Sequence, residues 1–290
     1  MPGMIGTPTV KAFFDARTSS VQYVASCPAT KTCVIIDPVL DFDARSGATA
    51  TNNADAILAH VREAGLTVAW ILDTHPHADH FSAASYLKRC TGAPTAIGSH
   101  IGEVQALWKE IYGWPQLATD GSQWDRLFTD GETFCIGDIH ARVMFSPGHT
   151  LASITFIIGD ATFIHDTLFM PDSGTARTDF PGGSAAQLWT SIQGILALPD
   201  ETRLFVGHDY QPGDREPLWE STVKEQRAEN VHLVTARTEA EFIALREGRD
   251  RTLPMPQLIL QSLQVNIQGG KLPKPESNGR SYLKIPLDAL

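Results

Sequence analysis

The feature that most constrains this chain is a cluster of potential metal ligands in one short segment. Three imidazoles and one carboxylate fall within six positions, His75-Pro76-His77-Ala78-Asp79-His80. The segment directly follows residues 68–72, an apolar run with the character of a buried strand. Residues two apart in an extended chain point the same way, so His75 and His77 can converge on one ion. A solvated polar loop is the alternative, and it explains this concentration of ligands poorly.

Strands and helices alternate along the chain in a pattern that predicts a layered α/β fold. Apolar runs predict strands at residues 32–38, 68–72 and 203–206, and antiparallel hairpins over residues 133–165. Helical periodicity predicts helices at residues 81–90, 101–111 and 184–198. Ser184 and Thr238-x-x-Glu241 are typical of helix N-termini. We expect sheets inside and helices outside, with one main domain over residues 1–230 and residues 231–290 packed on it as an extension.

Charge and cysteine usage limit the partners of the chain. The formal net charge is -10, with 23 basic and 33 acidic residues and no basic run, so we expect no nucleic-acid partner. The longest apolar runs, such as residues 154–158, are too short to cross a bilayer, so we expect no membrane partner. The four cysteines form no C-x-x-C pair, which predicts free thiols and a cytoplasmic protein. The oligomeric state stays open, and a homodimer is one option.

Three later segments place a further His or Asp directly after an expected strand. They contain His149 in Ser146-Pro147-Gly148-His149, Asp166 after residues 161–164, and His208 after residues 204–206. A catalytic metal needs about three protein ligands and an open position, so the first cluster alone cannot complete a site. Each single His has an ordinary alternative as a hydrogen-bonded loop residue. Together with the first cluster, the three segments predict one metal site at a shared sheet edge.

In their order and spacing, seven residues resemble the ligand set of the metallo-β-lactamase superfamily: His75, His77, Asp79, His80, His149, Asp166 and His208. The resemblance covers roughly residues 10–215 and implies an αββα sandwich with a helical C-terminal extension. It further implies that the first His pair and His149 bind one metal position. Asp79, His80 and His208 would bind a second position, with Asp166 between the two.

Two subfamilies, the persulfide dioxygenases and glyoxalase II, retain all seven residues. The segment Arg177-Thr178-Asp179-Phe180 resembles a signature of the persulfide dioxygenases, and so does His208-Asp209-Tyr210, where glyoxalase II typically has His-Glu-Tyr. Residues 167–174 and Leu263-Gln264-Val265-Asn266 resemble the bacterial branch of the dioxygenases. No cysteine is followed by Arg five or six positions later, as a rhodanese loop requires, which favours the stand-alone form.

The dioxygenase resemblance implies one Fe(II) per chain, held by His75, His149 and Asp166, with glutathione persulfide and O₂ as substrates. Sulfite and glutathione would be the products. His77, Asp79, His80 and His208 would then orient the ligands and hold water. Arg177, Tyr210 and Arg215 are candidates for substrate contact, and Asp179 is a candidate partner that holds Arg177 in place.

Two other hypotheses remain open. The first is a glyoxalase II-like hydrolase that cleaves a glutathione thioester at a site with two zinc ions. In that case His77, Asp79, His80 and His208 would complete the two-metal site. The second is a metal-stabilised scaffold that binds a partner without turnover.

Overall fold

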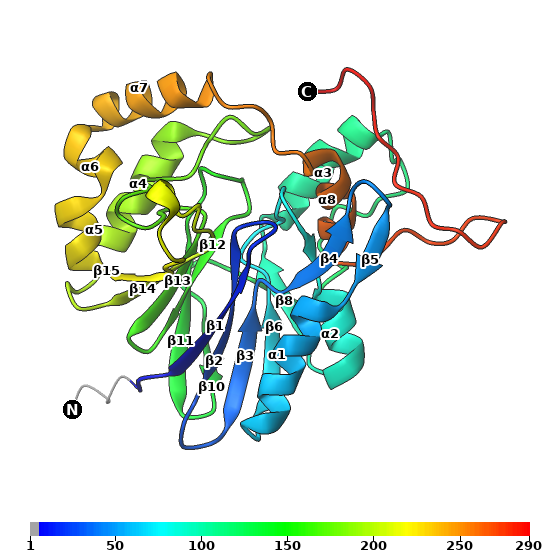
Figure 1. Cartoon of the computed structure of the whole chain (residues 1–290), viewed down its shortest axis with the longest axis horizontal. Coiled ribbons are helices and arrows are strands. Elements are labelled where there is room, and N and C mark those ends of the chain that lie inside the picture. Colours follow the sequence, from blue (N-terminus) through cyan, green and yellow to red (C-terminus); the bar gives the residue numbers. More distant parts are fainter. Residues whose placement is uncertain (1–5) are drawn as a thin grey trace.

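Two six-stranded sheets pack face to face in the computed structural model, which describes residues 6–290 (Figure 1). The first sheet has the order β1-β2-β3-β6-β8-β9, with strands Thr9–Asp15, Ser20–Ser26, Thr32–Ile36, Thr67–Leu72, Thr95–Gly98 and Arg126–Phe128. Strands β3, β6, β8 and β9 run parallel to one another, whereas β1, β2 and β3 are antiparallel. The residues that follow β3 and β6 therefore meet at one edge of the sheet.

The second sheet has the order β10-β11-β12-β13-β14-β15, with strands Thr133–Ile136, Ile139–Phe145, Ile154–Ile158, Ala161–His165, Arg203–Val206 and Glu220–Thr222. Strands β10 to β13 are connected antiparallel neighbours, which confirms the predicted hairpins. Strand β14 then joins β13 in parallel. A small third sheet has the order β5-β4-β7, with strands Ala48–Ala50, Val39–Asp43 and Phe81–Ser82.

Helices cover both outer faces of the pair of sheets (Figure 1). The helices associated with the first sheet are α1 (Asn52–Glu63), α2 (Ala84–Thr91), α3 (Ile101–Tyr112) and the C-terminal α8 (Ile259–Asn266). On the side of the second sheet lie α4 (Ala185–Leu196), α5 (Val223–Glu229), α6 (Val231–Thr235) and α7 (Glu239–Asp250). This arrangement confirms the predicted αββα sandwich with C-terminal helices.

The apolar core between the sheets joins side chains from both of them. Tyr23 of the first sheet contacts Phe163 and Phe205 of the second edge-to-face, at centroid distances of 5.2 and 5.5 Å. All three side chains are almost fully buried. Burying one aromatic side chain stabilises a fold by about 1.5–3 kcal/mol, so this interface keeps the two sheets in a fixed relative position.

One sequence-based boundary near the site is wrong. The helix predicted for residues 81–90 begins later, at Ala84, because Phe81 and Ser82 form the short strand β7 against Leu40 and Val39. Asp79 and His80 therefore lie in a turn between two strands rather than at a helix N-terminus. The predicted caps at Ser184 and Thr238 are confirmed, since each side chain accepts a hydrogen bond from the first turn of its helix.

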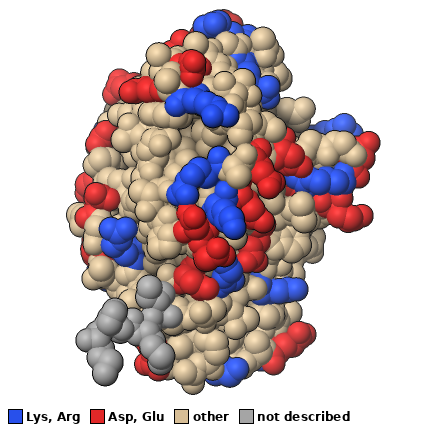
Figure 2. Space-filling model, turned by 90° about the vertical axis from the view of Figure 1, so that its left-hand side faces the viewer, with Lys and Arg blue, Asp and Glu red and all other residues tan. Residues whose placement is uncertain are grey.

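Surface charge, helix hydrophobicity and the cysteines concern the partners and thiols that the sequence led us to expect. On the face drawn in Figure 2, basic side chains lie among acidic ones and form no continuous basic tract. Among residues 6–290, no helix combines the length and the apolar character that crossing a membrane requires. All four cysteines are free thiols.

Candidate metal centre

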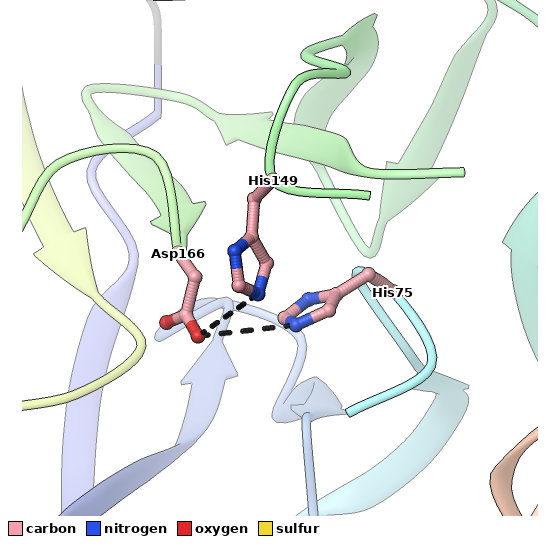
Figure 3. Close-up of side chains that lie close together, drawn as sticks. All are labelled: His75, His149 and Asp166. Carbon is pink, nitrogen blue, oxygen red and sulfur yellow. Dashed lines mark ion pairs between the residues drawn. The ribbon is translucent and has the colours of Figure 1, made fainter. Parts of the chain in front are cut away.

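Three side chains from three loops converge at one edge of the sandwich (Figure 3). His75 follows β6 of the first sheet, His149 follows β11 and Asp166 follows β13 of the second. Their ligand atoms all lie within 4.8 Å of one another, and all three residues are buried. The Asp166 Oδ2 atom is 3.6 Å from His149 Nε2 and 4.0 Å from His75 Nε2.

A buried carboxylate on the neighbouring strand orients His75. Asp37 follows β3, and its two oxygens accept hydrogen bonds from the Thr74 amide and the Thr74 hydroxyl, both at 2.7 Å. The Thr74 oxygen is in turn 3.0 Å from His75 Nδ1. This contact suits a tautomer in which Nδ1 carries the proton and Nε2 is free to bind a cation.

Contacts and backbone geometry also orient the other two candidate ligands, His149 and Asp166. His149 Nδ1 lies 2.9 Å from the carbonyl oxygen of Arg177, which leaves Nε2 facing Asp166. A register shift in β13 and a left-handed backbone at His165 (φ 41°) turn the chain just before Asp166. Irregularities of this kind often redirect a side chain at a functional site.

His208 lies between two carboxylates. Its Nδ1 is 2.7 Å from Asp166 Oδ1, and its Nε2 is 2.8 Å from Asp79 Oδ2. Burial disfavours a charged ring, but Asp166 and Asp79 outweigh it and raise the pKa of His208 well above its usual value. Burial alone would likewise raise the pKa of Asp166, yet His208 lowers it to about 2. Both nitrogens of His208 are therefore engaged with carboxylates.

The remaining members of the predicted set form a second group. The ligand atoms of His77, Asp79 and His80 also lie within 4.8 Å of one another. His77 Nε2 is 3.1 Å from Asp37 Oδ1, and His80 Nδ1 is 3.0 Å from Asp79 Oδ2. The structure thus brings all seven predicted residues together, in two groups that His208 connects.

The donor set fits a metal ion. The Nε2 atom of His75 is fully buried and has no hydrogen-bond partner, which is costly unless another species binds it. Burial also lowers the pKa of His75 and, less strongly, that of His149, so both rings are neutral as metal ligands must be. Two imidazoles and one carboxylate suit several divalent transition metals, including iron and zinc.

A cavity of about 590 Å³ opens onto this centre. His149, Asp166 and Asp79 form its floor, and Phe169 and Phe180 contribute apolar walls. Four arginines also line it, namely Arg17, Arg177, Arg246 and Arg249. The volume lies in the range of small-molecule binding sites, and the arginines favour an anionic ligand.

The predicted substrate-contact residues fall in different places. Tyr210 lines the cavity and stacks on His208, with ring planes 3° apart. Arg177 lines it too, but its guanidinium makes two 2.7 Å bonds to Asp179 and a third to the Pro254 carbonyl. Arg215 is not among the lining residues, and it pairs with Asp209 and Asp172 instead. This placement favours a structural role for Arg215 over substrate contact.

Several residues around the centre are not among the predicted site residues. Asp37 falls within the strand predicted for residues 32–38, and it follows β3 at the same sheet edge as His75. Arg246, Asp250 and Asn266 come from the C-terminal helices, and Arg249 faces the cavity from α7. The helical pattern assigns none of them to the site, because their partners lie far away in the sequence. Asn266 belongs to the Leu263-Gln264-Val265-Asn266 segment of the family resemblance, which gave it no role.

Gly148, next to His149, offers a test of how tightly the site is packed. Its backbone φ is +131°, and a Cβ there would lie 2.3 Å from the Leu188 amide nitrogen of α4. We expect Gly148→Ala to lower the free energy of unfolding by about 2–3 kcal/mol, from backbone strain and overpacking. Gly131→Ala is the matched control, since Gly131 also has a positive φ but an open environment. Equal losses for both variants in urea unfolding would contradict this expectation.

The fold and the site together define a metal-dependent protein whose ligands lie at the edge of two packed sheets. The chain belongs to the metallo-beta-lactamase superfamily, whose family model matches residues 17–208. It is 70% identical over 286 residues to a "Beta-lactamase hydrolase-like protein" of Xylella fastidiosa, covering 99% of this chain and 66% of that relative. The chain thus spans slightly less than two thirds of the length of this relative.

Other relatives point in two functional directions. A "Glyoxylase B2" of Dictyostelium discoideum is 46% identical, with 97% of both chains covered. A bovine "Persulfide dioxygenase ETHE1, mitochondrial" is 28% identical, covering 91% of this chain and 90% of the relative. A crystal structure of ETHE1 from Myxococcus xanthus superposes with a TM-score of 0.73 at 29% identity, covering 91% of this chain and all of that one.

Proposed function

We propose that the chain is a persulfide dioxygenase with one iron, which oxidises glutathione persulfide with O₂ and water to sulfite and glutathione. The observation that carries the proposal is the three-residue donor set of His75, His149 and Asp166. Two histidines and one carboxylate on one face of a metal are typical of non-haem Fe(II) oxygenases. The likeness to the Myxococcus xanthus ETHE1 structure supports the same assignment.

The hydrogen bonds around the donor set support a single metal. A second metal at Asp79, His80 and His208 would need a free nitrogen on His208. Both of its nitrogens lie within 2.8 Å of a carboxylate oxygen instead. His77 faces Asp37 and is absent from the group formed by His75, His149 and Asp166.

The residues of the cavity fit the proposed substrate. When bound, Fe(II) supplies open coordination positions at which a persulfide sulfur and O₂ can meet. His149 and Asp166 border the cavity, so a sulfur atom placed there reaches the metal position. Phe169 and Phe180 limit the access of water, and the arginines complement the carboxylates of a glutathione moiety. Tyr210 offers a hydroxyl and an aromatic face at the same cavity.

A two-zinc hydrolase acting on a glutathione thioester is the second candidate. The names of the relatives favour it, as does the second group of His77, Asp79 and His80. Nδ1 of His77 and Nε2 of His80 are buried without a hydrogen-bond partner, so this group also offers free nitrogen ligands. His75, His77, Asp79, His80, His149, Asp166 and His208 would hold the two zinc ions, which would supply activation of water for thioester hydrolysis.

The two candidates are separated by measuring oxygen consumption and metal content together. Protein loaded anaerobically with Fe(II) is expected to consume one O₂ per glutathione persulfide and to release sulfite. Elemental analysis of freshly purified protein is expected to give one iron per chain. Absence of oxygen uptake at full iron occupancy, with hydrolysis of S-lactoylglutathione by protein containing two zincs, would reject the dioxygenase.

Arg249 is expected to bind a carboxylate of the substrate. Among residues 6–290, the other three arginines of the cavity have carboxylate partners, whereas none lies within ion-pair distance of Arg249. We expect Arg249→Ala to raise KM for glutathione persulfide about tenfold with little change in kcat, through loss of one charge-assisted hydrogen bond. Arg251→Ala is the control, because Arg251 is exposed and does not line the cavity. An unchanged KM would assign the carboxylate to another residue.

A further inference from the structure

A buried amide of the last helix holds the loop that carries the first histidine cluster. Asn266, at the end of α8, is 2% exposed. Its Nδ2 donates to the carbonyl oxygens of His77 and His80, both at 2.7 Å, and its Oδ1 accepts from the Ser82 amide at 2.8 Å. His77 and His80 belong to the turn between β6 and β7, and Ser82 belongs to β7; all three lie more than 180 residues earlier in the chain.

A series of contacts connects that turn to Asp166. Asp79 lies in the turn, between the two carbonyls that Asn266 binds, and its Oδ2 contacts His208 Nε2 at 2.8 Å. The other nitrogen of His208 contacts Asp166 Oδ1 at 2.7 Å. The path from Asn266 to the carboxylate therefore consists of the turn backbone, Asp79 and His208.

A second buried side chain holds the loop behind His149. Asp250, at the end of α7, accepts hydrogen bonds on Oδ2 from the Thr178 amide at 2.9 Å and the Thr178 hydroxyl at 3.0 Å. Its other oxygen pairs with Arg246, which also donates to the Thr175 carbonyl at 2.8 Å. These bonds fix the backbone on both sides of Arg177, whose carbonyl oxygen contacts His149 Nδ1.

We propose that Asn266 and Asp250 are positioning residues of the metal centre, through which the C-terminal helices set the orientation of Asp166 and His149. The inference rests on His149 and Asp166 being metal ligands, as in the proposed function. It is independent of whether the metal is iron or zinc and of the reaction catalysed. Supporting residues of this kind typically contribute about 10- to 100-fold to metal affinity or activity.

The decisive variants are Asn266→Ala and Asp250→Asn, each paired with a control on the same helix. Gln264→Ala removes an equally buried amide of α8 whose bonds go only to Leu260 and Lys284. Thr238→Ala removes the N-terminal cap of α7, at the opposite end from Asp250. If Asn266→Ala does not fold, Asn266→Ser replaces it and keeps one hydroxyl donor.

The readouts are the dissociation constant of Co(II), measured by competition with a chelator, the visible spectrum of the Co(II) protein, and stability in urea. We expect both variants to bind Co(II) about 10- to 100-fold more weakly and to shift its spectrum. Both controls should lose stability but keep the affinity and spectrum of the parent. Parental affinity and spectrum in both variants, or equal weakening in their controls, would overturn the inference. Weakened Co(II) binding in the variants, together with no oxygen consumption by the iron-loaded parent protein, would reject the proposed reaction but not this inference.

Discussion

Replacing Asp166 by alanine is expected to yield a folded protein that no longer retains a stoichiometric metal. Asp166 supplies the only carboxylate of the three-residue donor set, and its Oδ2 atom faces the Nε2 atoms of both histidine ligands. Loss of a residue that only supports a ligand costs about 10- to 100-fold in affinity, so loss of the ligand itself should exceed that range. Oxygen consumption should fall to the background rate.

The measurement is elemental analysis together with oxygen uptake after anaerobic loading with iron. Asp172→Ala is the matched control, because Asp172 is an exposed carboxylate six residues away that pairs with Arg215. It should keep one metal per chain and the parental rate. Full metal occupancy in Asp166→Ala would show that the ion binds elsewhere, with the group of His77, Asp79 and His80 as the next place to test.

His208→Gln is expected to keep one metal per chain while losing about 10- to 100-fold in activity, since it disconnects Asp166 from Asp79. The stoichiometry is the informative part of this prediction. In a one-iron enzyme His208 contacts no metal, so the count stays at one. In a two-zinc enzyme His208 is a ligand of the second ion, so the count should fall from two toward one.

Folding measurements on His208→Gln distinguish a specific loss of metal or activity from a general loss of folding. Circular dichroism of His208→Gln should remain close to that of the parent. Its urea midpoint should fall, because loss of the buried, charged ring leaves Asp166 and Asp79 without their shared partner. Tyr210 stacks on the ring, so Tyr210→Phe, which keeps this contact, is a suitable control. A metal count that falls in His208→Gln but not in Tyr210→Phe would favour the hydrolase.

Local sequence pattern predicted most of the strands but not the short strand β7, which depends on a tertiary contact. The strands at residues 68–72, 133–165 and 203–206 were predictable because alternation and β-branched runs are local signals. Strand β7 was not, since Phe81 and Ser82 are extended only through pairing with β4. Tertiary pairing overrides local preference in such short segments.

The site residues likewise fall into those that local sequence pattern indicates and those that depend on long-range contacts. His75, His149 and Asp166 were candidates because each follows an expected strand, and the family resemblance implied that these three are the ligands. Asp37 contacts Thr74 at a separation of 37 positions in the sequence. Asn266 contacts its loop at separations of 184 to 189 positions, and Asp250 contacts Thr178 at a separation of 72. Periodicity carries no information on such pairs. A buried polar residue at the end of a helix, as at Asn266 and Asp250, becomes informative only once its partners are known.

The distribution of the ligands over the two sheets has a thermodynamic consequence. His75 belongs to the first sheet, whereas His149 and Asp166 belong to the second, so a bound ion cross-links the two halves of the sandwich. An ion that binds only the folded chain stabilises it by RT ln(1 + [M]/Kd), about 2.7 kcal/mol at a free concentration of 100 Kd. The melting temperature of this protein should therefore report the free metal concentration of its surroundings.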